Sequence, residues 1–334
     1  MRSFLLTDQR LDALQLTQVP SPRPKDGEVL VRLHATSLNH LDLLVARDGY
    51  GNTSHPLIPG TDGAGEIAAL GAGVSGWSVG ERVIPALMID WPDGPYTETS
   101  SARARGVNLP GSLADYTTVP AHALVRTPGH LSDVQASTLP IAATTAWRAM
   151  SRGQVGPSST VLLLGTGGVS VFALQLAKAL GARVIVTSSS DEKLQQAQAL
   201  GADEIINYRT TPAWDAEVLA LTAGRGADLV LEAVGKATFA RSINACAVSG
   251  VIFVIGFMGG THAEVPMLPI IAKALTIAGN STGSTADLAD VTQFMAAHGI
   301  EPVIDRVFPF EQAPAAYRYL ADAGHFGKVV IDPQ

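Results

Sequence analysis

The residues that most clearly suggest chemistry are the glycines of "GTGGVS", at Gly165, Gly167 and Gly168, which follow the apolar run "TVLLL". Between a strand and a helix, such glycines let the backbone approach a pyrophosphate, and the helix N-terminus supplies N–H donors and a positive dipole. Ser170 stands where a third glycine is usual, and its small side chain keeps helix and strand close. The stretch predicts a nicotinamide dinucleotide site, and the alternative is a glycine turn without a ligand.

The next apolar run, "RVIVTSSS", ends at Ser188 and Ser189, where NAD-binding proteins carry an acidic residue that holds the ribose 2′-hydroxyl. A carboxylate there would repel a 2′-phosphate by about 4 kcal/mol per pair of unit charges roughly 4 Å apart at an effective dielectric of about 20. Because that carboxylate is missing and Lys193 adds a cation one helical turn further on, the sequence favours NADP(H) over NAD(H).

The same segment allows a second interpretation. Ser190 or Asp191 is a good N-cap for the helix predicted over "EKLQQAQAL", and Lys193 is then a solvated side chain. Tyr208 or Arg209, after the following predicted strand, is expected to close the phosphate pocket if the first interpretation holds.

A second glycine-rich stretch, "PGTDGAG" (59–65), surrounds Asp62. It does not lie between a buried strand and a helix, which is the context that phosphate loops require. We therefore predict a turn here and assign phosphate binding to the later glycines.

The elements around these motifs fall into two kinds. From Gly27 to Asp133, short β-type runs such as "EVLVRLHA" and "GERVIPAL" are separated by Gly and Pro, which predicts a mostly β region. Within it, residues 88–112 lack periodicity and are longer than most compact loops, so this segment is a flap over a site or a mobile segment, and we favour the flap.

After Ser132 the pattern becomes repeated strand and helix. The strands are nearly continuous apolar runs, as in a parallel sheet whose two faces are both covered by helices. The last part, ending in "GKVVIDP", resembles the first region more than the middle one. We predict an α/β fold with a β-rich domain over 1–126 and 284–334 and a doubly wound, Rossmann-type domain over 127–283.

Composition limits the classes of function. The chain has 334 residues, a formal net charge of −7 and no block of Lys or Arg, which argues against nucleic acid or an anionic membrane as partner and favours a small-molecule substrate. Apolar runs are strand-sized, and no export signal is visible, so we expect a cytoplasmic protein without a membrane span. Cys246 is the single cysteine and is expected to be a buried structural thiol.

Seven ordered motifs carry a resemblance over essentially the full chain: "LNHLDLL", "PGTDGAGEI", "VGERV", "LPIAATTAW", "GTGGVS", "GADEIINYR" and "HFGKVVI". The sequence resembles the medium-chain dehydrogenase/reductase superfamily, and within it the zinc-independent quinone oxidoreductase branch that includes ζ-crystallin-like proteins. The resemblance implies a GroES-like catalytic domain, a Rossmann NADP-binding domain, a cleft between them, and a homodimer that pairs through the strand "LTIAGNS".

The resemblance also bears on metal. Alcohol dehydrogenases of the superfamily place zinc-binding Cys, His and Cys where this chain has Asn39, Thr61 and a residue near Ile141. Amide, hydroxyl and alkyl groups are poor zinc ligands, and the eight histidines form no HxH or HxxxH pair, so we predict no metal.

The resemblance places Asn39, Asp42 and Tyr50 on the catalytic wall. Asn39 is expected to donate an amide hydrogen bond to a carbonyl or to the cofactor, Asp42 to orient its neighbours, and Tyr50 to orient the acceptor or supply a proton. Each has a structural alternative, since Asn and Asp satisfy loop backbone and Tyr50 sits between glycines.

Backbone after the fourth and fifth parallel strands should line the nicotinamide half, because ligands bind outside the carboxyl ends of such strands. With the residues that the resemblance adds, the predicted cofactor-binding set is Thr145, Gly165, Thr166, Gly167, Gly168, Val169, Ser188, Ser189, Lys193, Tyr208, Ala233, Val234, Gly235, Ile255, Gly256, Phe257, Asn280, Ser281, Phe326, Gly327 and Lys328.

Three functions are compatible with this site. The first is an NADPH-dependent reductase of quinones or α,β-unsaturated carbonyls, in which hydride passes directly and charge develops on a distant oxygen without a Lewis acid. The second is an alcohol or aldehyde oxidoreductase that works without zinc through a Tyr or Ser relay. The third is an NADPH-binding structural or regulatory protein with little turnover. We favour the first.

Overall fold

The computed structural model describes residues 1–47, 50 and 53–333. It divides the chain into two compact units, one formed by Met1–Thr144 with Gly283–Gln334 and the other by Thr145–Thr282. The boundary between the first and second units follows Thr144, whereas the sequence places it after residue 126. The boundary falls later because helix α2 (Asp133–Ala136) packs against the sheet of the first unit, so the chain leaves that unit only after α2.

The second unit contains a six-stranded parallel sheet in the order β10-β9-β8-β11-β12-β13, which confirms the predicted doubly wound fold. Every residue of β8 is buried, as expected for a strand covered on both faces. The strands are β8 (Thr160–Leu164), β9 (Arg183–Ser188), β10 (Glu204–Asn207), β11 (Ala227–Glu232), β12 (Cys246–Val254) and β13 (Thr276–Gly279).

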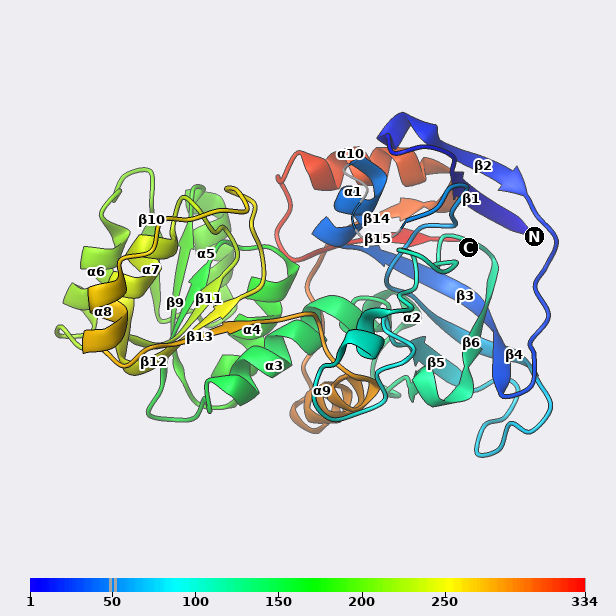
Figure 1. Cartoon of the computed structure of the whole chain (residues 1–334), viewed down its shortest axis with the longest axis horizontal. Coiled ribbons are helices and arrows are strands. Elements are labelled where there is room, and N and C mark those ends of the chain that lie inside the picture. The colour runs from blue at the N-terminus through cyan, green and yellow to red at the C-terminus, as the bar shows by residue number, and fades with distance from the viewer. Residues whose placement is uncertain (48–49, 51–52, 334) are drawn as a thin grey trace. The chain divides into compact units, whose positions relative to one another are not determined.

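Helices connect these strands. Right-handed crossovers place α4 and α5 on one face of the sheet and α6, α7 and α8 on the other, where Figure 1 shows the last three side by side. Strand order reverses between β8 and β11, and the carboxyl ends beside such a switch point form the crevice in which α/β proteins bind ligands. The helices are α3 (Thr144–Arg152), α4 (Gly168–Ala179), α5 (Asp191–Ala199), α6 (Trp214–Leu221), α7 (Phe239–Ala245) and α8 (Met267–Ala272).

The first unit is built on a seven-stranded mixed sheet in the order β14-β15-β3-β4-β5-β7, with β6 also paired to β3 and a separate hairpin of β1 and β2. The strands are β1 (Arg2–Leu6), β2 (Leu14–Gln18), β3 (Glu28–Leu38), β4 (Ala64–Leu70), β5 (Arg82–Pro85), β6 (Tyr116–Pro120), β7 (Leu124–Arg126), β14 (Ile304–Pro309) and β15 (Lys328–Asp332). The longer helices are α1 (His40–Arg47), α9 (Thr285–His298) and α10 (Ala313–Ala321), and a π-helical turn spans Leu139–Ala143. β15 lies antiparallel to β3, with Val329 opposite Leu38, so the end of the chain is placed beside residue 39.

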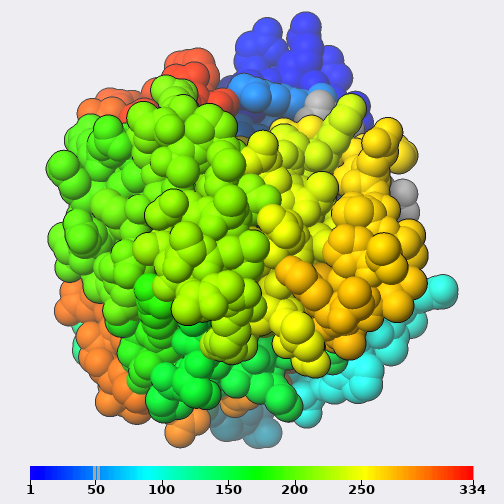
Figure 2. Space-filling model, turned by 90° about the vertical axis from the view of Figure 1, so that its left-hand side faces the viewer, coloured from blue at the N-terminus to red at the C-terminus, as the bar shows by residue number. Residues whose placement is uncertain are grey.

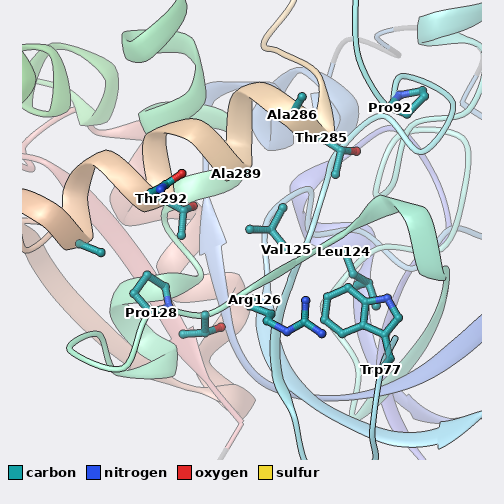
Figure 3. A pocket seen from close by; sticks show the side chains of 13 residues that line it. Trp77, Pro92, Leu124, Val125, Arg126, Pro128, Thr285, Ala286, Ala289 and Thr292 are labelled. Atoms are coloured by element: carbon teal, nitrogen blue, oxygen red, sulfur yellow. The ribbon is translucent and has the colours of Figure 1, made fainter. Parts of the chain in front are cut away.

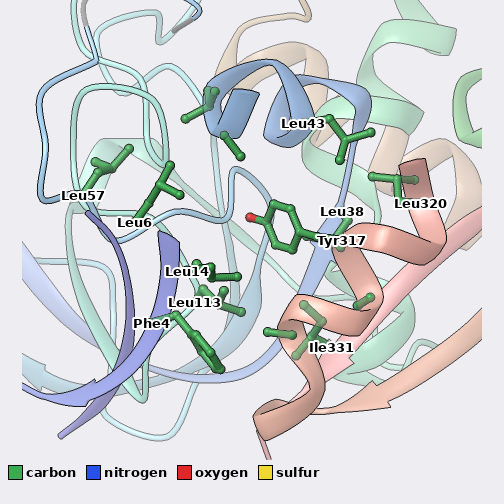
Figure 4. Packing of buried hydrophobic residues seen from close by; sticks show 14 of the residues in the cluster. Phe4, Leu6, Leu14, Leu38, Leu43, Leu57, Leu113, Tyr317, Leu320 and Ile331 are labelled. Atoms are coloured by element: carbon green, nitrogen blue, oxygen red, sulfur yellow. The ribbon is translucent and has the colours of Figure 1, made fainter. Parts of the chain in front are cut away.

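The main core of the first unit lies between this sheet and the helices α1 and α10. Tyr317 of α10 packs among Leu38 of β3, Leu43 of α1 and Leu320 (Figure 4). The same cluster includes Ile141, which is therefore a packing residue near the position that carries a zinc ligand in the relatives considered above.

Residues 88–112 form an ordered part of the first unit. Trp91 is buried, its ring meets that of Tyr96 edge-on at 5.0 Å, and Arg103 pairs with Asp90 at 2.6 Å. These side chains therefore pack the segment on itself, and the flap over a site stays a prediction.

A buried arginine anchors this segment. The Arg105 guanidinium donates to Thr117 Oγ1 at 3.1 Å and to Ser112 Oγ at 2.9 Å, while its Nε has no hydrogen-bond partner among the described residues. Burial lowers the pKa of Arg105 to about 10. Two hydroxyl oxygens therefore accept hydrogen bonds from the Arg105 guanidinium, and no carboxylate of the described residues pairs with it.

Among the described residues, no helix is long and apolar enough to cross a bilayer.

Candidate active site

Three segments that are far apart in the sequence meet in the first unit: the end of β3, the turn before β4 and the start of β15. β3 pairs antiparallel with both β4 and β15, with Ala35 opposite Ala64 and Leu38 opposite Val329. This pairing brings Asn39, the Thr61–Asp62 pair and Lys328 together in a buried hydrogen-bonded network. Asp42, in the first turn of α1, completes it.

Asp42 organises the turn. Its Oδ1 accepts from the Thr61 N–H at 2.9 Å, and its Oδ2 accepts from Thr61 Oγ1 at 2.9 Å and from the Asn39 N–H at 2.8 Å. The carboxylate thus satisfies an N–H at the start of α1 and orients Thr61 at the same time. The expectation that Asp42 orients its neighbours agrees with this geometry.

The Asn39 side-chain amide is engaged at both ends. Its Oδ1 accepts from Lys328 Nζ at 2.6 Å, and its Nδ2 donates to Asp62 Oδ2 at 2.8 Å and to Thr61 Oγ1 at 3.3 Å. An amide nitrogen carries two hydrogens, so both are used within the network. The amide orientation is therefore fixed, and the donor expected for a substrate carbonyl is already occupied in this structure.

Burial shifts the charged groups of the network. Burial raises the pKa of Asp42 to about 6, against hydrogen bonds from Asn39 and Thr61 that lower it, while the Asp62 charge raises it further. Burial also raises the pKa of Asp62 and lowers that of Lys328, although their charges, 3.6 Å apart, favour the ion pair. The second oxygen of Asp62 has no hydrogen-bond partner among the described residues.

Tyr317 is a further polar group beside this network that the sequence analysis did not identify. Its hydroxyl is fully buried without a hydrogen-bond partner in the described chain, and burial together with the Asp42 charge raises its pKa well above the usual value. The helical pattern "QAPAAYRYLADAG" predicts its helix but gives no signal that this ring lies near Asp42.

Tyr50 stands apart from the network. Its side chain is 47% exposed and makes no hydrogen bond to the described residues, while its backbone carbonyl accepts from Thr53 Oγ1 at 2.8 Å. Gly49 and Gly51, on either side of Tyr50, lie outside the described part of the chain.

The glycine turn in the second unit has the geometry that a pyrophosphate needs. Gly165 has φ +88°, in the region that favours glycine, and a Cβ added to either Gly165 or Gly167 would meet nothing within 4 Å. Helix α4 begins directly after Gly167 and has no acidic residue in its first turn, so its free N–H groups and positive dipole are not offset. Ser170 is buried, and its Oγ donates to Leu164 O at 3.4 Å, as a residue at a close helix–strand contact should.

The predicted phosphate pocket lies at the ends of β9 and β10. Ser190 caps α5 by accepting from the Lys193 N–H at 3.3 Å, so the N-cap interpretation holds for Ser190 itself. Asn207 pairs with Ser188 in the sheet, and the Tyr208 N–H donates to the Ser188 carbonyl at 3.1 Å. Tyr208 therefore follows directly beside Ser188, and the 2′-phosphate pocket itself stays a prediction.

Two loops follow β11 and β12 at the same edge of the sheet. Residues 233–235 and 255–257 lie against each other, because a Cβ at Gly256 would be 2.5 Å from Ala233 O, and the Gly259 N–H donates to Val234 O at 2.7 Å. Asn280, after β13, accepts from Arg148 Nε at 3.1 Å, and Thr145 is buried at the start of α3.

The C-terminal part of the predicted cofactor set belongs to the first unit. The Phe326 N–H donates to Asp305 Oδ1 at 3.0 Å, and a Cβ at Gly327 would lie 2.5 Å from Val303 O. Lys328 is buried, with its ammonium donating to Leu38 O at 2.8 Å and to Asn39. A cofactor contact of Lys328 stays a prediction, and nothing in the sequence indicates that its charge enters the Asn39 network.

A separate groove of about 570 Å³ lies in the first unit between α9 and the segment 124–128 (Figure 3). Its walls are mostly apolar, and Arg126 stacks over the Trp77 ring at 4.3 Å on one side. None of the predicted catalytic or cofactor residues lines it. The lining residues are Trp77, Pro92, Leu124, Val125, Arg126, Thr127, Pro128, Thr285, Ala286, Ala289, Thr292, Gln293 and Ala296.

Comparison with known proteins agrees with this architecture. Residues 25–129 match the alcohol dehydrogenase GroES-like domain, and residues 168–297 match the zinc-binding dehydrogenase domain. A zinc-type alcohol dehydrogenase-like protein of Schizosaccharomyces pombe is 42% identical over 91% of this chain and 90% of its own length. An acryloyl-coenzyme A reductase of Metallosphaera sedula is 28% identical over 95% and 96%.

A solved structure supports the same assignment. The crystal structure of a putative alcohol dehydrogenase from Sinorhizobium meliloti 1021 has a TM-score of 0.93 and 39% identity, over 99% of this chain and 98% of that one. The two units thus define an oxidoreductase with a GroES-like domain and a Rossmann domain. The chain belongs to the medium-chain dehydrogenase/reductase superfamily, whereas its membership of the quinone oxidoreductase branch stays a prediction.

The zinc that the matched domain name implies does not fit the residues present. Asn39 Oδ1 already accepts the Lys328 ammonium, Thr61 Oγ1 donates to Asp42, and Ile141 is a buried alkyl group. Zinc requires thiolate, imidazole or carboxylate ligands in a tetrahedral arrangement. Neither an amide oxygen held by a cation nor a threonine hydroxyl meets that requirement.

Proposed function

We propose that this protein is an NADPH-dependent oxidoreductase that transfers hydride directly to the β-carbon of an α,β-unsaturated carbonyl compound or to a quinone, without zinc. The observation that carries the proposal is the Asn39–Lys328 contact of 2.6 Å, which fills the position of a zinc ligand with a hydrogen-bonded amide. Without a Lewis acid, reduction of a simple aldehyde loses its main source of charge stabilisation. A conjugated acceptor places the developing charge on a distant oxygen, where water or a dipole stabilises it.

The second unit would hold the cofactor. Gly165, Gly167 and the N-terminus of α4 present bare backbone to the pyrophosphate, and Ser188, Lys193 and Tyr208 face the 2′-phosphate under this proposal. When bound, a reduced nicotinamide supplies the hydride. The relative that reduces acryloyl-coenzyme A supports a conjugated acceptor, because its name describes such a substrate.

The first unit would hold a rigid polar wall against the acceptor. Asp42 fixes Thr61, and Lys328 fixes the Asn39 amide, so these dipoles do not need to reorient during the reaction. Because the Asn39 hydrogens are used within the network, we assign the final protonation of the product to solvent. Asp42 and Lys328 are positioning residues in this scheme.

The test is an assay panel with purified protein. NADPH oxidation is followed with quinones, enones, enoyl thioesters, aldehydes and ketones, and NADP reduction is followed with alcohols. We expect turnover with conjugated acceptors at least tenfold above that with simple aldehydes, in line with the lost Lewis acid. Turnover confined to alcohol and aldehyde pairs would reject the proposal.

The relative of Schizosaccharomyces pombe, named as a zinc-type alcohol dehydrogenase-like protein, favours an alcohol or aldehyde oxidoreductase as the second candidate. In this chain such an enzyme would work without zinc, because Asn39 and Thr61 are committed to hydrogen bonds. The same panel separates the two, because the second candidate predicts reversible alcohol oxidation. Tight NADPH binding with no turnover on any compound would instead indicate a structural or regulatory protein.

We also propose a homodimer that forms through the edge of the second unit. Among the described residues β13 has a sheet partner, β12, on one side only, and several apolar side chains of β13, α8 and the preceding loop are exposed. Figure 2 shows the face of the second unit that carries α8. Exposed apolar patches of this kind mark association surfaces, and an open strand edge accepts a second strand. The exposed apolar residues are Met258, Met267, Leu268, Ile271 and Ile277.

A further inference from the structure

Glu232 is a fully buried carboxylate at the end of β11, directly before the loop 233–235. Its Oε1 accepts from the Val234 N–H and the Gly235 N–H, both at 2.9 Å, and from Thr238 Oγ1 at 2.7 Å. Its Oε2 accepts from Ser242 Oγ, on α7. Among the described residues no Lys, Arg or His pairs with it, so four neutral donors receive the charge.

These four hydrogen bonds satisfy both oxygens of the Glu232 carboxylate. An ionised carboxylate in an apolar interior is costly unless several hydrogen bonds satisfy it, and hydrogen bonds to a charged acceptor are about twice as strong as neutral ones. Two of the four donors are consecutive backbone N–H groups of the loop. The carboxylate therefore holds the loop backbone in one conformation, in which Gly235 has φ +83°.

The loop 233–235 contacts the neighbouring loop after β12 through its backbone. The Ile255 N–H donates to Glu232 O at 2.9 Å, and the Gly259 N–H donates to Val234 O at 2.7 Å. A Cβ at Gly256 would lie 2.5 Å from Ala233 O, and a Cβ at Gly235 would lie 2.9 Å from Gly260 O. The two backbones are in such close contact that a shift of the first loop must move the second.

We propose that Glu232 is a positioning residue for the nicotinamide half of the cofactor site. It touches neither cofactor nor substrate, and it acts through the backbone of residues 233–235 and, through them, 255–257. The adenosine half is served by β9 and α5 at the other side of the glycine turn, which Glu232 does not contact. The inference rests on the dinucleotide binding proposed above, and it names Glu232 as the group that positions the nicotinamide half of that site.

The experiment compares Glu232→Gln with the wild-type protein in binding of NADPH and of 2′,5′-ADP, which carries the adenosine and 2′-phosphate but no nicotinamide. Glutamine keeps the shape and removes the charge that strengthens the loop hydrogen bonds. We expect NADPH to bind about tenfold more weakly, since two charge-assisted bonds become neutral, and 2′,5′-ADP to bind as before. Glu232→Ala should enlarge the same difference, and if that variant does not fold, the Gln variant alone decides.

Asp228→Asn is the matched control, because Asp228 lies at the opposite end of the same strand, where it accepts from the Thr160 N–H at 2.7 Å. It should change the binding of neither ligand. Equal loss of both ligands in Glu232→Gln would show a general structural role and overturn the inference, as would unchanged NADPH binding. If the wild-type protein prefers NADH, the proposed cofactor is wrong. The role of Glu232 is then tested in the same way, by comparing the binding of NADH with the binding of 5′-AMP in Glu232→Gln and in the wild-type protein. If the wild-type protein binds neither dinucleotide, both proposals fail.

Discussion

Lys328 Nζ lies 2.6 Å from Asn39 Oδ1 and 3.6 Å from Asp62 Oδ2, so a cation from the last strand holds an amide at the end of β3. All three side chains are buried. The amide, in turn, donates to Thr61 and Asp62. One contact between residues 289 positions apart therefore sets the orientation of the group at the first zinc-ligand position of the related alcohol dehydrogenases.

Removal of the Lys328 charge should destabilise the protein strongly. Lys328→Met leaves Asp62 buried without its cation, and breaking a buried pair in this way costs about 3 to 5 kcal/mol in the free energy of unfolding. Urea denaturation measures this, and Asp62→Asn in the same chain should restore part of the loss. Lys178→Met, which breaks the partly exposed pair with Asp203, is the control and should cost about 1 kcal/mol or less. Equal effects of the two single variants would contradict the buried ion pair.

Metal removal should leave activity unchanged. Asn39 and Thr61 are committed to hydrogen bonds and are poor zinc ligands. We expect elemental analysis of purified protein to find well below one zinc per chain, and dialysis against a chelator to leave turnover as it was. One tightly bound zinc per chain, with activity that is lost on its removal and regained on its return, would overturn the zinc-independent mechanism.

Asp42 should make stability depend on pH between about 4 and 6. Its pKa rises from 3.8 to about 6 on folding, so in this range the folded chain binds more protons than the unfolded chain, and stability falls as pH rises. The shift corresponds to about 3 kcal/mol, lost between these two values. The free energy of unfolding measured from pH 4 to pH 7 should show this fall in the wild-type protein and a smaller one in Asp42→Asn. The same slope in both proteins would contradict the raised pKa.

Lys193 should select between cofactors. If its ammonium faces the 2′-phosphate, Lys193→Ala should raise KM for NADPH about five- to tenfold, since a partly solvated charge pair contributes about 1 kcal/mol, and should leave KM for NADH nearly unchanged. Lys25→Ala, in the first unit, controls for the loss of one surface charge. Equal changes for the two cofactors, or none, would support the solvated lysine of the alternative interpretation.

A charge on the exposed apolar surface should separate the proposed dimer. Leu268 and Ile271 are 75% and 71% exposed, so Leu268→Glu with Ile271→Glu should not disturb the core of the chain. Sedimentation or light scattering should show a dimer for the wild-type protein and a monomer for the double variant. Val79→Glu, at another exposed apolar residue, should leave the dimer intact. A wild-type monomer at working concentrations would refute the homodimer.

Local patterns in the sequence were sufficient for the fold class and the glycine turn. The continuous apolar run of β8 and the glycines after it predict a strand, a turn and a helix, because each depends on neighbours within a few residues. The structure places the turn where it was predicted, with open space above Gly165 and Gly167.

Only the tertiary structure decided the partners of the buried charges. Strand pairing places Lys328 beside Asn39, and helix packing places the Tyr317 hydroxyl near Asp42. The fold around β11 likewise directs the Glu232 carboxylate to the N–H groups of the loop 233–235. Sequence periodicity reports which face of an element is buried, but not which other element covers it. The sequence by itself therefore determined the type of fold and the residues available for chemistry, whereas strand register and packing determined which of those residues meet.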